Sequence, residues 1–159
     1  MTRLTENQVA PPFTLPNQFA RPVSLAQFAP QRVVLYFYPA DDTPGCTAEA
    51  TEFQELLDDF LACGARVVGV SPDAIETHRA FAEAHHLTFD LLSDPPRRVM
   101  TDYGAYGEKM LYGKRVVGVI RSTVVVSAKG TVERAFYNVR AHGHAARVLR
   151  AVGELALGD

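Results

Sequence analysis

Cysteine is scarce in this chain, which has only Cys46 and Cys63 among 159 residues. Two cysteines are too few for a disulfide framework, and they lack the grouping of a zinc site. Both are therefore expected to be thiols of a cytoplasmic protein, because cytoplasmic thiols are kept reduced.

Charge excess and long apolar runs are absent as well. The formal net charge is −2, which gives no reason to propose nucleic acid or an acidic membrane as a partner. No stretch has the length and apolar character of a membrane span, and the first seven residues lack the apolar core of a signal peptide. Without internal repeats or linkers, we expect one domain over residues 1–159, with enough apolar residues (47%) for a sizeable core.

Apolar runs and turn signals predict an α/β chain with a thioredoxin-like order of elements: a central mixed β-sheet, helices on both faces and an N-terminal β-hairpin. The hairpin is expected at residues 9–16 and 23–25, at the edge of the sheet, followed by a helical turn at 25–28. Strands are expected at 33–38, 66–71, 89–92, 122–126 and 132–137. Helices are expected at about 44–63, 74–86, 97–103 and 145–155, with Ile75, Phe81 and Ala82 facing inward in the second of them.

Cys46 occupies the most informative position. The apolar run 33–38 enters its segment and a helical pattern leaves it, so the thiol is expected in the first turn of a helix. Pro44 suits the first helical position, because its missing N–H costs nothing there. Free N–H groups and the helix dipole favour negative charge at this point. Cys46 is therefore expected to be a nucleophilic thiolate.

The residues around Cys46 are more specific still. The segment from Tyr36 to Ala50 resembles the active-site segment of peroxiredoxins, in particular the bacterioferritin comigratory protein, or PrxQ, subfamily. The general pattern Pro-x-x-x-Thr/Ser-x-x-Cys is met by Pro39, Thr43 and Cys46. The similarity spans nearly the whole chain through further short segments in the same order, at residues 69–73, 91–94, 112–114, 118–123 and 143–145.

This resemblance implies a thioredoxin fold and reduction of hydrogen peroxide or organic hydroperoxides. It implies Cys46 as the peroxidatic nucleophile, Thr43 with its hydroxyl in the pocket, Arg121 reaching the thiolate and the peroxide, and Pro39 packed over the sulfur. Capping of the helix by Thr43 would hold its hydroxyl in place. No metal, flavin or haem is implied. A monomer is favoured, with a homodimer left open.

The chain departs from many PrxQ members at one important position. Where they carry a resolving cysteine, five residues after the first, this chain has Thr51. Cys63 lies 17 positions after Cys46, or ~25 Å along one continuous helix, whereas a disulfide needs Cα atoms within ~7 Å. We therefore expect a one-cysteine cycle in which thioredoxin, glutaredoxin or a small thiol reduces Cys46, and a structural role for Cys63. A resolving role or an intermolecular bridge of Cys63 stays open as the less favoured alternative.

Other polar residues have ordinary explanations. Asp41 and Asp42 are interpreted as solvated loop carboxylates, and Glu49 as a residue stabilised by the helix dipole, with only a weak claim to the site. The histidines at 85, 86, 142 and 144 lack the i, i+4 spacing of a metal pair, which favours surface or capping roles. The segment 112–114 lacks the glycine pattern of a phosphate loop.

Two other functions are alternatives to the peroxidase. A disulfide oxidoreductase on the same fold would require the motif Cys-x-x-Cys, but the residue three positions after Cys46 is Glu49. A non-enzymatic holdase or peroxide sensor would be oxidised once and would not turn over. Steady-state consumption of peroxide with a thiol donor distinguishes these functions.

Overall fold

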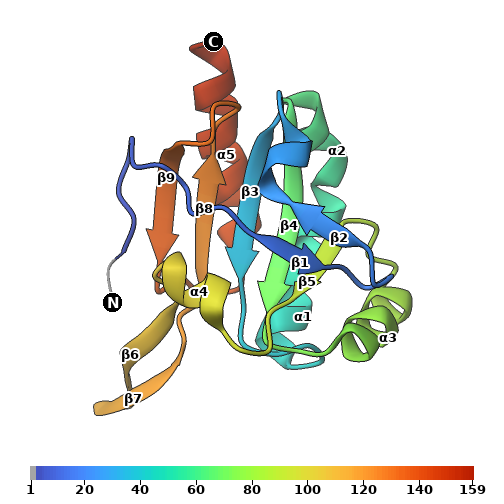
Figure 1. Cartoon of the computed structure of the whole chain (residues 1–159), viewed down its shortest axis with the longest axis vertical. Helices are drawn as coiled ribbons and strands as arrows, with labels where there is room; N and C mark the ends of the chain where they lie inside the picture. Colours follow the sequence, from blue (N-terminus) through green and yellow to red (C-terminus); the bar gives the residue numbers. More distant parts are fainter. Residues whose placement is uncertain (1–2) are drawn as a thin grey trace.

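The computed structural model describes residues 3–159 and is built on a five-stranded sheet in the order β5-β4-β3-β8-β9 (Figure 1). Its strands are β3 (Arg32–Phe37), β4 (Ala65–Ser71), β5 (Asp90–Ser93), β8 (Ser122–Val126) and β9 (Val132–Tyr137). β3, β4 and β5 pair in parallel, whereas β8 pairs antiparallel with both β3 and β9. The sheet is therefore mixed, as the sequence predicts.

The central strand β3 is apolar on both faces. Val33, Leu35 and Phe37 belong to one core cluster, and Val34 and Tyr36 belong to the other. Because successive side chains of a strand point to opposite faces, the continuous apolar run corresponds to a strand covered on both sides.

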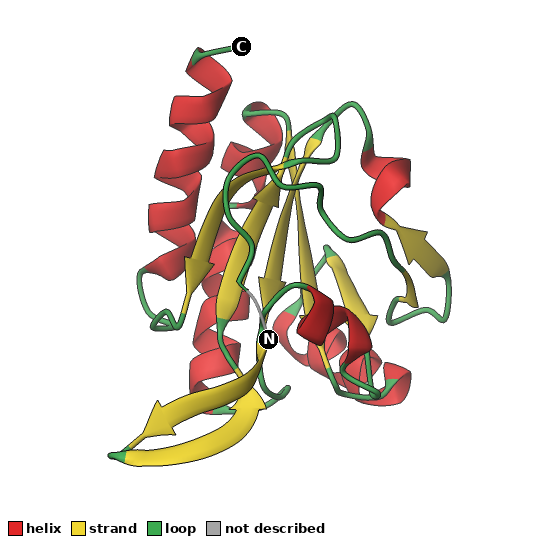
Figure 2. Ribbon diagram, turned by 60° about the vertical axis from the view of Figure 1, so that its left-hand side comes forward, coloured by secondary structure: helices red, strands yellow, loops and turns green. Residues whose placement is uncertain are grey.

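Each face of the sheet has its own covering layer (Figure 2). One face packs against α1 (Pro44–Glu55), α2 (Leu57–Ala62), α3 (Ile75–His85) and α5 (His144–Leu157). The other packs against the N-terminal segment, β1 (Thr14–Pro16), β2 (Pro22–Ser24), the 3-10 helix η1 (Leu25–Phe28) and α4 (Arg98–Asp102). This arrangement confirms the predicted fold class. The N-terminal hairpin, however, forms a separate two-stranded sheet instead of extending the edge of the central one.

The predicted helix at 44–63 is wrong in one respect, because it is interrupted at Leu56, where α1 ends and α2 begins. Phe53 and Phe60 are both fully buried, with ring centroids 5.8 Å apart. In one straight helix, residues seven apart would be displaced by about 10.5 Å along the axis. The break therefore lets α2 bring Phe60 against Phe53 and pack on β4.

The inward face of α3 also differs from the expectation. Phe81 and Ala82 are buried as predicted, but Ile75 is only half-buried. His78 takes the remaining buried position and is fully inaccessible. A polar ring in this place requires hydrogen-bond partners, which are described below.

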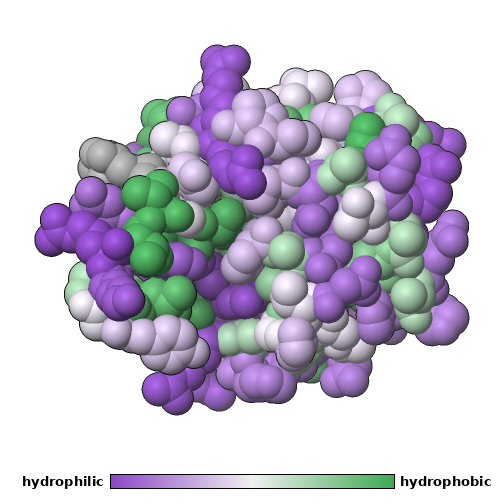
Figure 3. Space-filling model, turned by 90° about the horizontal axis from the view of Figure 1, so that it is seen from below, coloured by the Kyte–Doolittle hydropathy of each residue, from purple (hydrophilic) through white to green (hydrophobic). Residues whose placement is uncertain are grey.

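A second hairpin, formed by β6 (Tyr106–Leu111) and β7 (Lys114–Val119), was not predicted. Its turn places Tyr112 and Gly113 at positive φ (51° and 78°). Two-residue turns of this kind usually carry Asn or Asp before the Gly, so the sequence signal was weak. The hairpin projects from the body of the molecule and exposes Met110, Leu111 and Val117. Figure 3, seen from below, shows apolar atoms gathered on the side where Figure 1 places this hairpin.

Within residues 3–159, no helix combines the length and the apolar character that crossing a membrane would require.

Candidate active site

Cys46 lies where the sequence predicts, as the third residue of α1, beyond the end of β3. Pro44 begins the helix. The thiol residue is buried, with 1% of its surface exposed. In the preceding loop Asp42 has a φ of 62°, a left-handed conformation that is uncommon outside glycine but that Asp adopts more readily than most residues.

Arg121 is brought to Cys46 by the register of the sheet. Phe37, the last residue of β3, pairs with Ser122, the first residue of β8. Arg121 precedes Ser122 and therefore lies beside the loop that follows β3. Its Nη2 lies 3.4 Å from Sγ of Cys46, so the pairing of strands distant in sequence places a cation on the sulfur. A Cβ at Gly45 would be 3.2 Å from the same Nη2, so glycine leaves room for the guanidinium.

Glu49 holds the other side of this guanidinium. Its Oε1 accepts a 2.6 Å hydrogen bond from Nη1 of Arg121, and its side chain is fully buried. Burial raises the pKa of Glu49 to about 7, although Arg121 acts to lower it. Burial acts to lower the pKa of Arg121, but the contacts with Glu49 and Cys46 outweigh this effect. The pKa of Arg121 is therefore raised above its usual value. Glu49 thus belongs to the site, and the helix dipole is not its main partner; the i, i+3 spacing from Cys46 could have indicated this.

The site contains free hydrogen-bonding capacity. Among the described residues, Oε2 of Glu49 and the hydroxyl of Tyr36 have no partner. The Tyr36 ring stacks against Phe53 and Tyr38. Burial, and next Glu49, raise the pKa of Tyr36 far above its usual value, so the phenol stays protonated. The Glu49 oxygen is thus unpaired beside the guanidinium that contacts the sulfur, and the Tyr36 hydroxyl is unpaired within the core cluster that contains Cys46.

Thr43 and Pro39 lie in the loop before Cys46. Thr43 is exposed and takes the N-cap position of α1, but its hydroxyl donates a 3.0 Å hydrogen bond to the carbonyl of Ala40. The expectation that capping would hold this hydroxyl is therefore wrong, since a local turn contact holds it instead. Pro39 is half-buried and directly follows Tyr38.

Asp41 is not the solvated carboxylate that the sequence suggested. It is buried, and its oxygens contact the hydroxyl of Tyr38 and Nδ1 of His78, each at 2.6 Å. Asp42 is exposed, as expected. Within residues 3–159, Asp41, Asp73 and His78 form the one cluster whose donor atoms lie close enough to hold a metal ion. These atoms already serve hydrogen bonds within the protein, so the cluster carries no argument for a metal.

His144 is the exception to the surface role expected for the histidines. It is 3% exposed, at the start of α5, with Nε2 2.7 Å from Oγ1 of Thr123. Burial, and next the charges of Arg147 and Arg121, lower the pKa of His144 to about 4. The ring is therefore neutral at physiological pH. His142 is exposed, with its side chain 82% accessible.

Cys63 lies at the opposite end of the sheet. It directly follows the last residue of α2 as its C-cap and is half-buried. The next residue is Gly64, whose carbonyl accepts a hydrogen bond from the N–H of Arg32 at the start of β3. Cys46 follows the other end of β3, a strand of six residues that spans roughly 17 Å at 3.3 Å per residue, so the two cysteines lie near opposite ends of this strand. Figure 1 shows α1 and α2 at different ends of the molecule.

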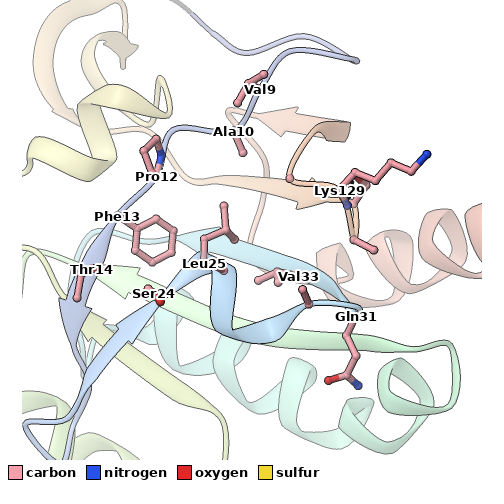
Figure 4. Close-up of a pocket in the computed structure, with 15 residues that line it drawn as sticks. Val9, Ala10, Pro12, Phe13, Thr14, Ser24, Leu25, Gln31, Val33 and Lys129 are labelled. Atoms are coloured by element: carbon pink, nitrogen blue, oxygen red, sulfur yellow. Dashed lines mark hydrogen bonds between the residues drawn. The ribbon is translucent and has the colours of Figure 1, made fainter.

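A mostly apolar cavity of about 700 Å³ also lies away from the sulfur (Figure 4). Phe13, Leu25 and Val33 line it, near the N-terminal end of β3. Lys129 is the only ionisable residue of its lining, and Figure 4 shows that side chain extending away from Phe13. The cavity therefore offers no reactive group and is not the candidate active site.

The raised pKa of Glu49 predicts a pH dependence of stability. Between its ordinary pKa of 4.5 and about 7, the folded protein binds a proton that the unfolded chain does not. Stability from this group is therefore complete below pH 4.5 and is lost as pH rises through 7, by about 3 kcal/mol in order of magnitude. Urea denaturation should show wild type losing stability relative to Glu49→Gln from pH 5 to 8. A constant difference between the two proteins would contradict the prediction.

A buried cysteine at a helix N-terminus on a mixed sheet, with a guanidinium on its sulfur, is typical of an enzyme that uses a cysteine as nucleophile. The AhpC/TSA family profile matches residues 7–135 of this chain. A Mycobacterium tuberculosis protein whose name assigns it provisionally to the peroxiredoxins is 54% identical over 149 residues, covering 94% of this chain and 95% of the relative. Peroxiredoxin Bcp of Escherichia coli K12 is 37% identical over 156 residues, covering 98% and 100%.

Solved structures agree with these relatives. A mutant of peroxiredoxin Q from Xanthomonas campestris superposes with a TM-score of 0.88 at 34% identity, covering 96% of this chain and 99% of the other. A PrxQ mutant from Xylella fastidiosa gives 0.90 at 30% identity, covering 98% and 99%. The chain therefore belongs to the AhpC/TSA family. It is a peroxiredoxin of the Bcp/PrxQ type with a thioredoxin fold, and thus a thiol-dependent peroxidase.

Proposed function

We propose that the chain reduces hydrogen peroxide and organic hydroperoxides at Cys46 and is recycled by an external thiol. The observation that carries the proposal is the 3.4 Å contact between Arg121 and the sulfur, with Glu49 behind the guanidinium. In the first step the thiolate attacks the terminal peroxide oxygen and the O–O bond breaks. Cys46 becomes a sulfenic acid, and the departing hydroxide or alkoxide takes a proton to leave as water or alcohol.

Ionisation of the thiol does not account for a fast reaction by itself. A thiol of pKa ~8.5 is roughly 3% ionised at pH 7, so complete ionisation gains about thirtyfold. For thiols in general, a fall of ~2.5 in pKa would also weaken the nucleophile roughly tenfold, at a Brønsted slope of ~0.4–0.5. The remaining acceleration must come from alignment of the peroxide and stabilisation of charge as the bond breaks.

The site residues supply these two effects. Arg121, a fixed cation 3.4 Å from the sulfur, stabilises the charge that moves onto the peroxide oxygens, and Glu49 positions it. The Thr43 hydroxyl already donates to Ala40, so toward the peroxide it acts as a hydrogen-bond acceptor. Pro39, beside the buried Tyr38, limits the access of water to the sulfur.

The Thr43 role can be tested by a conservative pair of variants. Thr43→Val should lower the peroxide rate constant about tenfold, the effect of one neutral hydrogen bond of ~1.4 kcal/mol. Thr43→Ser should keep the rate, because it retains the hydroxyl. Since Thr43 is exposed, neither change should disturb folding. Equal peroxide rate constants for Thr43→Val and wild type, measured by stopped flow, would show that the Thr43 hydroxyl has no role in the reaction with peroxide.

Recycling uses a thiol from outside the chain. That thiol attacks the sulfenic sulfur, releases water and forms a mixed disulfide, and a second thiol restores Cys46 and leaves with the first as a disulfide. Thr51 stands where many PrxQ members carry a second cysteine, and Cys63 lies at the other end of β3. Thioredoxin, glutaredoxin and small thiols are the candidate donors.

Intact mass after one equivalent of peroxide tests this cycle. Wild type and Cys63→Ser should both gain one oxygen, trapped by a sulfenic-acid reagent, and should turn over equally with thioredoxin or dithiothreitol. Thr51→Cys, which restores the second cysteine, is the positive control for detecting an internal disulfide. A loss of two mass units in wild type, with Cys46 joined to Cys63 in one chain, would refute the one-cysteine cycle.

We also propose that the whole chain acts as one domain and as a monomer. The central sheet joins β3, β4 and β5 to the late strands β8 and β9, and both core clusters combine residues from early and late parts of the chain. Sedimentation velocity at micromolar concentration should give one species near 17.4 kDa. A species of twice this mass would favour the homodimer.

A further inference from the structure

A buried histidine–aspartate pair joins the loop before Cys46 to helix α3. Nδ1 of His78 lies 2.6 Å from Oδ2 of Asp41, and both side chains are completely inaccessible. Neither residue contacts the sulfur directly. The pair therefore acts on the site only through the loop that Asp41 belongs to.

The hydrogen-bond partners of His78 fix its ring on both sides. Nε2 lies 3.0 Å from the carbonyl oxygen of Leu92, which can only accept, so this nitrogen carries a proton. Nδ1 faces a carboxylate that also accepts from the Tyr38 hydroxyl. A second proton therefore lies between His78 and Asp41, and the two form a charge-assisted hydrogen bond away from water. Removal of either partner leaves the other buried without its counterpart.

Asp41 is anchored by its backbone as well. Its N–H donates a 2.8 Å hydrogen bond to Oδ2 of Asp73, which also accepts from the Ser71 hydroxyl at 2.7 Å. The loop is thus tied to the end of β4 and to α3, both outside α1. The next residue, Asp42, has the left-handed φ of 62°. Anchoring at Asp41 helps to fix this turn and with it the entry of the chain into α1.

The same loop must move during the proposed cycle. Cys46 is 1% exposed, so an external thiol cannot reach its sulfenic acid while the first turn of α1 is in place. Peroxide reaction needs the closed arrangement, in which Arg121 contacts the sulfur, and reduction needs an open one. A contact present only in the closed arrangement favours the first reaction over the second.

We propose that His78 is a positioning residue: through Asp41 it holds the loop and the first turn of α1 in the closed, peroxide-reactive arrangement, and the pair separates when Cys46 opens to its reductant. The inference rests on the proposed one-cysteine function. It assigns a role in the reaction to His78, a fully buried residue of α3.

The test measures the two half-reactions of Cys46 separately. His78→Gln should lower the rate constant with hydrogen peroxide about tenfold or more, because small misplacements of reacting groups are costly. The same variant should be reduced by dithiothreitol several-fold faster, because the open state is more populated. It should also form less sulfinic acid in excess peroxide. Asp41→Asn should reproduce these effects, and the double variant should add little to either single one.

Matched controls separate positioning from general stability. Glu83→Gln changes an exposed residue of α3 and should leave both rates unchanged. Val33→Ala weakens the core at the opposite end of β3 and should not make the two rates diverge. Any result for His78→Gln other than opposite changes in the two rates overturns the proposal. A wild-type protein that does not turn over peroxide refutes the proposed function instead.

A measurement on unmutated protein covers the case in which His78→Gln does not fold. Cys46 is held open as a mixed disulfide with thionitrobenzoate, and amide hydrogen exchange is compared with that of the reduced protein. Peptides covering residues 39–50 and 75–80 should lose protection together. Full protection at the start of α3, with residues 39–50 exposed, would show that the pair survives opening and would overturn the proposal.

Discussion

Replacement of Cys46 by serine is expected to abolish peroxide consumption. A serine hydroxyl is not ionised at neutral pH and forms no sulfenic acid, so the change removes the attacking atom and leaves the buried volume nearly unchanged. The measurement is steady-state loss of hydrogen peroxide with thioredoxin or dithiothreitol as donor, and Cys63→Ser is the matched control with the other thiol removed.

The outcome also distinguishes an enzyme from a sensor. An enzyme gives many turnovers with wild type and none with Cys46→Ser. If wild type instead consumes one equivalent of peroxide and no thiol donor reduces Cys46 again, the protein is a peroxide sensor and not a peroxidase. Turnover that persists in Cys46→Ser would place the chemistry at another residue and contradict the assignment of the site.

The second large effect is expected at Arg121. Its removal should lower the rate constant for sulfenic acid formation by about 10²–10³, the usual cost of one preorganised donor. The rate should be measured at a pH where Cys46 is fully ionised, so that any change reports on bond breaking. If Arg121→Ala reacts as fast as wild type under this condition, the guanidinium is not stabilising the transition state.

The single substitution Arg121→Ala also removes the partner of Glu49 and leaves this carboxylate buried beside an empty space. Loss of one partner from a buried ion pair typically costs 3–5 kcal/mol, so the single variant risks unfolding. The double variant Arg121→Met, Glu49→Gln removes both charges and should keep the fold. It should show the same loss of rate, while Glu49→Gln alone keeps the guanidinium and should lose less. This comparison separates catalysis from stability.

The sequence predicted well what depends on local pattern. The apolar run at 33–38 became β3, the proline before Cys46 became the first residue of α1, and both late strands and the last helix are present. The family pattern also indicated Arg121, although nothing local relates it to Cys46. The contact itself depends on the pairing of Phe37 with Ser122, which a single sequence does not specify.

The two wrong interpretations of acidic residues share a physical cause, which is pairing between residues far apart in the chain. Asp41 looked solvated because its partner, His78, lies 37 positions away on α3. Glu49 looked like a helix-dipole residue because Arg121 is 72 positions away. The β6–β7 hairpin was not predicted for a local reason. Tyr112 has a positive φ in its turn, and tyrosine is not a residue type that indicates such a turn.

The interruption at Leu56 limits how far a disturbance that starts at Cys46 can travel. Uncoiling of α1 meets a terminus after Glu55, because α2 has its own contacts with β4 and α5. Exposure of the sulfur to a donor therefore requires melting of at most one twelve-residue segment while the neighbouring helix stays docked. A rigid rod from Pro44 to Cys63 would make each catalytic round a much larger unfolding event.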